Sequence, residues 1–95
     1  MVEKGVSKES PSFNGQSDIL GQEENYLILH NDDIHTFDYV IESLVNICEH
    51  NTVQAEQCTY IIHYKGKCDV KKGLYDYLKP MKDGLIERGL NATIG

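Results

Sequence analysis

The apolar residues of this 95-residue chain recur at regular steps only from about Asn25 onward. Before that point, Ser, Gly, Glu and Lys surround isolated apolar residues that fit no helical or strand period. We therefore expect residues 1–22 to be a disordered N-terminal extension and residues 23–95 to form the only domain. A patterned stretch this short has room for one small hydrophobic core.

The first patterned segments predict one strand followed by two helices. The run 26–30 is apolar and rich in residues that favour strands, and Asn31-Asp32-Asp33 ends it in a turn. Thr36 is a good N-cap for a helix that ends near His50-Asn51, because apolar residues then recur at three- and four-residue steps. Thr52 offers an N-cap for a second helix, which Gly66 stops.

The remaining residues predict a strand, a helix and a last strand. Residues 67–71 alternate weakly, Gly73 opens a helical pattern that Gly89 ends, and residues 90–94 are a plausible strand. Pro80 lies within the helical pattern, so this helix is expected to begin later than its pattern suggests. The order βααβαβ predicts an α+β sandwich, with a three-stranded antiparallel sheet and three helices on one face.

Composition excludes several classes of function. The net charge of -6 and the pI near 5 argue against binding to nucleic acid or to anionic membranes, since both need clustered Lys and Arg. No segment has the length of a membrane span or the apolar core of a signal peptide. The three cysteines form no C-x-x-C pair, which favours reduced, packing thiols in a cytoplasmic protein.

A group of hydrogen-bond acceptors is expected where the first strand ends. Asn31, Asp32 and Asp33 supply amide and carboxylate oxygens, and His63 supplies one imidazole nitrogen when it is neutral. An ammonium group has three donors and no acceptor, so this set suits a protein amino group better than a phosphate. Phe37, Val40 and Ile62 could add an apolar pit beside the acceptors. An N-D-D sequence alone is most often just a turn.

Three segments together resemble the ClpS family. They are the apolar strand with N-D-D over residues 27–33, the helix start Phe-Asp-Tyr-Val-Ile over 37–41, and His-Tyr-Lys-Gly-Lys over 63–67. The resemblance implies a non-catalytic N-degron adaptor without a cofactor. Such an adaptor binds substrates that begin with Leu, Phe, Tyr or Trp and passes them to the ClpA or ClpC unfoldase for degradation by ClpP. The family also suggests a monomer.

The resemblance also implies roles for individual residues. Asn31, Asp32 and His63 would hold the α-amino group of the substrate. The pocket for the first side chain would be lined by six residues, namely His35, Phe37, Val40, Leu44, Thr59 and Ile62.

The chain departs from the family at this pocket. His35-Thr36 stands where the family usually has Thr-Pro, so the entrance carries an extra titratable ring. Phe37 and Thr59 replace the Met that many members have on each of the first two helices. One position is therefore larger and stiffer, and the other is smaller and more polar.

Two other classes of function stay open at this point. A metal-dependent hydrolase could use the carboxylates Asp32 and Asp33 with His30, His35 and His63, although no H-E-x-x-H spacing is present. Alternatively, the chain is a non-degron protein-interaction module on the same scaffold, because a fold does not guarantee a function. A measurement of metal content would distinguish the hydrolase from an adaptor. Dependence of binding on a free amino terminus would distinguish an adaptor from the interaction module.

Overall fold

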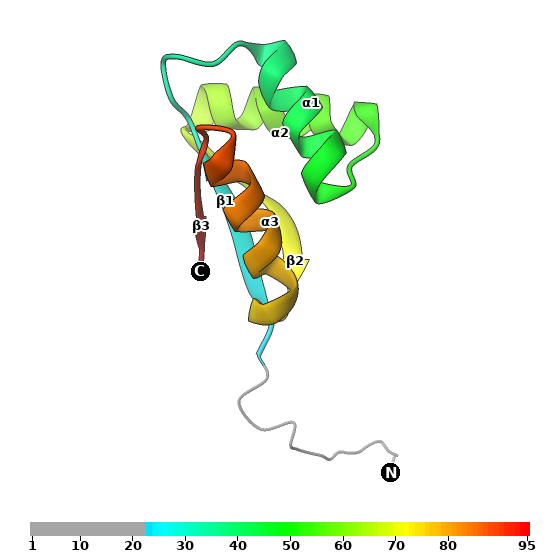
Figure 1. Cartoon of the computed structure of the whole chain (residues 1–95). Coiled ribbons are helices and arrows are strands. Elements are labelled where there is room, and N and C mark those ends of the chain that lie inside the picture. Colours follow the sequence, from blue (N-terminus) through cyan, green and yellow to red (C-terminus); the bar gives the residue numbers. More distant parts are fainter. Residues whose placement is uncertain (1–22) are drawn as a thin grey trace.

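A computed structural model describes residues 23–95, and the extension expected over residues 1–22 lies outside the described part. Three strands and three helices follow one another in the expected βααβαβ order (Figure 1). The elements are β1 (Asn25–His30), α1 (Phe37–Cys48), α2 (Thr52–Lys65), β2 (Lys67–Gly73), α3 (Tyr75–Glu87) and β3 (Asn91–Ile94). The predicted α+β class is confirmed.

The three strands form one antiparallel sheet in the order β2-β1-β3, so β1 is central. Its side chains alternate, since Leu27 and Leu29 are buried whereas Tyr26 is exposed. Only one face of the sheet is therefore covered. In Figure 1, α3 runs along the sheet, and α1 and α2 gather at the end where β1 stops. Within residues 23–95 no helix is long and apolar enough to cross a bilayer.

The ends of the helices follow ordinary capping chemistry. The Oγ1 of Thr36 accepts the backbone N–H of Tyr39 at 3.1 Å, as expected for the N-cap of α1. The N-cap of α2 is Asn51 and not Thr52, because the Asn51 Oδ1 accepts from Gln54 at 2.8 Å. Gly66 ends α2 with a φ of 92°, a conformation in which glycine carries no steric cost.

The expected late start of the third helix is wrong, since α3 begins at Tyr75 and contains Pro80. A proline removes the hydrogen bond to the carbonyl four residues earlier, which here belongs to Asp76. That carbonyl lies in the exposed first turn, where water can satisfy it. The helix therefore passes through Pro80 and still buries Leu78 and Met81 against the core.

The pairing of β1 with β2 contains a bulge that a buried histidine completes. Leu27 pairs with Lys71 and Ile28 with Asp69, so Val70 is an extra residue of β2. The Nε2 of His50 lies 2.6 Å from the Val70 carbonyl, which can only accept, so this nitrogen carries the proton. His50 is 4% exposed and thus satisfies a buried carbonyl.

The three cysteines are free, and all pack against the core. Burial raises the pKa of the Cys48 thiol to about 11 and that of Cys68 to about 12. Such thiols stay protonated at neutral pH, so they act as small apolar side chains.

We expect His50→Ala to lower the free energy of unfolding by about 2–3 kcal/mol. The substitution leaves the Val70 carbonyl without its partner and opens a cavity. Urea denaturation followed by circular dichroism measures the change. The matched control is His63→Ala, which removes an exposed ring and should cost less than about 0.5 kcal/mol. Equal losses from the two variants would contradict this role of His50.

Candidate functional site

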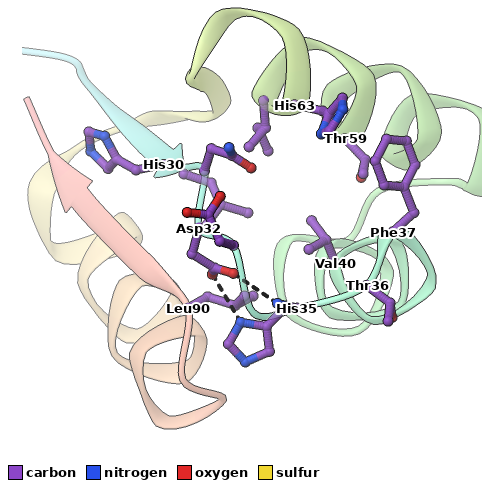
Figure 2. A pocket seen from close by; sticks show the side chains of 13 residues that line it. His30, Asp32, His35, Thr36, Phe37, Val40, Thr59, His63 and Leu90 are labelled. Atoms are coloured by element: carbon purple, nitrogen blue, oxygen red, sulfur yellow. Dashed lines mark hydrogen bonds and ion pairs between the residues drawn. The ribbon is translucent and has the colours of Figure 1, made fainter.

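A pocket of about 300 Å³ lies where β1 ends, between the start of α1 and the C-terminal half of α2 (Figure 2). All of the predicted site residues except Leu44 line it. The lining consists of Leu29, His30, Asn31, Asp32, Asp33, His35, Thr36, Phe37, Val40, Thr59, Ile62, His63 and Leu90. Residues that are far apart in the sequence thus converge on one cavity.

Leu44 lies outside this pocket, contrary to the expectation. It is fully buried in the hydrophobic core with Leu27, Leu29 and Leu85. Leu44 follows Val40 by one turn of α1, so sequence spacing places the two on the same helix face. Only packing decides that the cavity ends at Val40.

Sequence reasoning missed Leu90 as a pocket residue. It precedes β3, is buried, and lies at the pocket beside Asp32 and His35 in Figure 2. No local pattern marks this position, because its place depends on the pairing of β3 with β1. Its neighbour Gly89 has a φ of 85°, and a Cβ there would lie 3.3 Å from the Nε2 of His35. Glycine therefore lets the chain pass close to the ring.

One wall of the pocket is apolar and comes from two helices. Phe37 and Val40 project from α1 and Thr59 projects from α2 (Figure 2). Ile62 of α2 also lines the pocket. The Thr59 hydroxyl donates to the Ala55 carbonyl at 2.8 Å, so its proton is used within α2. This wall therefore offers a ligand apolar contact without a free hydrogen-bond donor.

The opposite side carries polar groups at the end of β1. Asn31 is held by its backbone N–H, which donates to the Gly66 carbonyl at 2.8 Å. Among residues 23–95 neither the Asn31 side chain nor the His63 ring makes a hydrogen bond to protein. Both side chains are solvent-exposed, so their acceptor atoms are open to a ligand.

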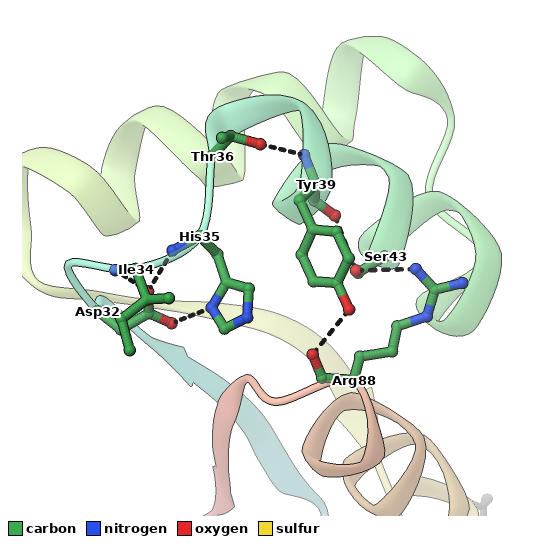
Figure 3. Close-up of polar contacts among 7 residues, drawn as sticks. All are labelled: Asp32, Ile34, His35, Thr36, Tyr39, Ser43 and Arg88. Atoms are coloured by element: carbon green, nitrogen blue, oxygen red, sulfur yellow. Dashed lines mark hydrogen bonds and ion pairs between the residues drawn. The ribbon is translucent and has the colours of Figure 1, made fainter.

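Asp32 holds the turn that leads into α1. Its Oδ1 accepts the backbone N–H groups of Ile34 and His35, each at 2.9 Å, and its Oδ2 lies 2.9 Å from the His35 Nδ1 (Figure 3). Partial burial acts to raise the pKa of Asp32, but the hydrogen bonds from His35 and Ile34 outweigh it and lower that pKa below its ordinary value. The carboxylate is therefore charged at neutral pH and fixed in position.

The His35 ring is fixed from its other side by Tyr39. The two rings stack with centroids 4.9 Å apart and an interplanar angle of 17°. The Tyr39 hydroxyl donates to the Arg88 carbonyl at 2.7 Å, and the Arg88 guanidinium donates to the Ser43 hydroxyl at 3.1 Å (Figure 3). These contacts tie the rim of the pocket to the end of α3.

The chemistry of the pocket suits a cation with an apolar side chain. Its polar lining contains two aspartates, an amide and imidazole rings, and neither Lys nor Arg lines it. A phosphate or carboxylate would meet negative charge, whereas an ammonium would find acceptors. The volume is at the lower end for ligand pockets, so it fits about one residue.

Two of the histidines that were considered as metal ligands of a hydrolase make contacts of another kind. The His30 ring turns away from the cavity, and its Nε2 lies 2.8 Å from the Thr93 Oγ1 on the open sheet face, while His35 contacts Asp32 (Figure 2). Within residues 23–95, no three His, Cys, Asp or Glu side chains are arranged to hold a metal ion.

The sequence over most of this fold and pocket matches one protein family, a family of protease adaptors. Residues 21–93 match the family described as ATP-dependent Clp protease adaptor protein ClpS. The match covers most of the chain, so the chain belongs to the ClpS family.

The same fold occurs in a solved structure, that of Agrobacterium tumefaciens ClpS2 bound to L-phenylalaninamide. The two align with a TM-score of 0.67 and 20% sequence identity, over 78% of this chain and 96% of that one. At this identity the likeness establishes the shared fold. No curated protein matches the sequence significantly.

We expect Asp32→Asn to lower the free energy of unfolding by about 1 kcal/mol at pH 7. The amide keeps an oxygen for the backbone N–H groups but loses the charged contact with His35. Because folding lowers the pKa of Asp32, its ionised form stabilises the fold at any pH above about 4, the pKa of this group in the unfolded chain. That contribution is lost as the pH falls through the folded pKa.

The measurement is urea denaturation of both proteins from pH 7 down to pH 3. The gap between wild type and Asp32→Asn should be largest well above pH 4 and should close below it. A gap that widens on acidification would contradict the assignment of this carboxylate.

Proposed function

We propose that this chain is an N-degron adaptor, which binds protein substrates by a free amino terminus that bears Leu, Phe, Tyr or Trp. The observation that carries the proposal is the pairing, in one small pocket, of an apolar wall with a rim of acceptors. Such a pocket recognises two features of a ligand at once, a positive amino group and a large apolar side chain. An internal Phe or Leu lacks the first feature and would be rejected.

In this proposal Asn31, Asp32 and His63 share the three N–H donors of the substrate α-ammonium. The charge of Asp32 makes one of these bonds charge-assisted, and its Oδ2 keeps accepting capacity beyond the contact with His35. His63 must be neutral to accept, and its exposed ring is free to do so. Asp32 thus holds the turn and the ligand with the same group.

The side chain of the first residue would enter between α1 and α2. Phe37, Val40, Thr59 and Ile62 supply apolar contact there, and His35 stands at the rim. Phe37 forms a flat and stiff part of the wall, which suits the face or edge of an aromatic ring. We propose that this pocket binds without catalysing a reaction and without a cofactor.

Delivery is the second half of the proposed function. We propose that residues 23–95 are the adaptor domain, acting as a monomer in the cytoplasm, and that the ClpA or ClpC unfoldase takes the bound substrate from it for degradation by ClpP. Support comes from the family, whose description names the Clp protease. No nucleic acid or membrane takes part in this scheme.

A fluorescence-anisotropy titration tests binding directly. The labelled peptide begins with free Phe, and its controls are the N-acetylated twin and an identical peptide that begins with Gly. We expect saturable binding of the free Phe peptide alone, because each control removes one of the two recognised features. If acetylation leaves the affinity unchanged, the pocket is no amino-group site, and a non-degron interaction module on this scaffold becomes the better description.

We expect His63→Ala to weaken binding of the free Phe peptide about ten- to a hundredfold. This corresponds to the loss of one charge-assisted hydrogen bond, about 1.5–3 kcal/mol. The matched control is His30→Ala, whose ring faces Thr93 and should leave the affinity unchanged. Full affinity in His63→Ala would remove His63 from the amine site.

A further inference from the structure

A continuous row of aromatic rings extends from the mouth of the pocket along the outer side of α2. We call these four residues, Phe37, Tyr60, His63 and Tyr64, the aromatic surface. Phe37 lies 5.2 Å, centroid to centroid, from both Tyr60 and His63 in edge-to-face contacts. His63 contacts Tyr64 at 5.0 Å, and the rings of Tyr60 and Tyr64 are nearly parallel at 6.3 Å.

The two tyrosines have no role in the core. Tyr60 is 54% exposed and Tyr64 is 76% exposed, and they lie four residues apart on one face of α2. The inward side of this helix is formed instead by Ala55, Thr59 and Ile62. Solvent-exposed aromatic rings that cluster on one helix face often indicate an interaction site.

The aromatic surface is continuous with the pocket, since Phe37 and His63 belong to both. When the first residue of a substrate fills the pocket, the rest of the substrate chain must leave through the mouth of the pocket. An extended chain advances about 3.3 Å per residue, so its second and third residues lie within about 7 Å of the amine site. The ring of Tyr60 lies 5.2 Å from that of Phe37, and the ring of Tyr64 lies 5.0 Å from that of His63, so both tyrosines are within that reach.

We propose that the aromatic surface receives the second and third residues of the same substrate, and that it favours planar side chains, either aromatic rings or the guanidinium of arginine. The proposal rests on the proposed function and adds a preference beyond the first residue. The rings of Tyr60 and Tyr64 are stacked with an interplanar angle of 8°, and both side chains are largely exposed, so a flat group can stack on an open ring face. An aromatic ring stacks there by offset contact, and guanidinium by cation–π attraction.

The experiment is a titration of peptides that share a free N-terminal Phe and differ at the second residue, which is Trp, Arg or Ala. Wild type should bind the Trp and Arg peptides about three- to tenfold more tightly than the Ala peptide. Tyr60→Ala combined with Tyr64→Ala should abolish this advantage and leave the affinity for the Ala peptide unchanged. Tyr60→Phe keeps the ring and should keep the advantage.

The control variant is Val53→Ala, which removes an exposed apolar side chain at the other end of α2 and should change nothing. An equal affinity of wild type for all three peptides would overturn the inference, as would an advantage that survives the loss of both tyrosines. In either case amine-dependent binding of the Ala peptide shows that the proposed function stands. If N-acetylation has no effect on any peptide, the proposed function fails and this inference falls with it.

Discussion

β1 pairs with β2 on one side and with β3 on the other, so its backbone groups are satisfied only when the two halves of the domain meet. The same strand buries Leu27 and Leu29 completely on the face that the helices cover. Every other element is therefore placed relative to β1. The pocket lies where this strand ends, because the chain leaves the sheet there and residues of α1 and α2 pack around that point.

In the proposed function, one charge in the turn after β1 serves both stability and recognition. Asp32 binds two backbone N–H groups and the His35 ring, which orders the start of α1. The same contacts hold its carboxylate rigidly at the pocket. A binding group whose position is already fixed loses little entropy when a ligand arrives, so under the proposed function the turn orders the site before binding.

The candidate site also has two kinds of residue, buried ones that support it and exposed ones that are open to a ligand. The apolar wall is part of the packed domain through Thr59 and Ile62, whereas Asn31 and His63 are solvent-exposed. The rings of Tyr60 and Tyr64 continue outward from that rim. A ligand bound as proposed would therefore contact the rigid pocket with its first residue and the exposed aromatic surface with the residues that follow.

The sequence by itself determined the elements and most of the candidate site. Apolar periodicity and caps are local, so the strand before Asn31 and the helices after Thr36 and Asn51 could be predicted to within a few residues. The acceptors at Asn31, Asp32 and His63 could also be named, because their chemistry depends on residue type.

Only the tertiary structure decided which side chains meet. Leu44 has the spacing of a pocket residue, yet packing puts it in the core, while Leu90 reaches the pocket through the pairing of β3. The bulge at Val70 and its contact with His50 likewise join residues that no local pattern connects. The physical reason is that periodicity fixes the face a residue occupies, whereas the neighbours of that face are set by the whole chain.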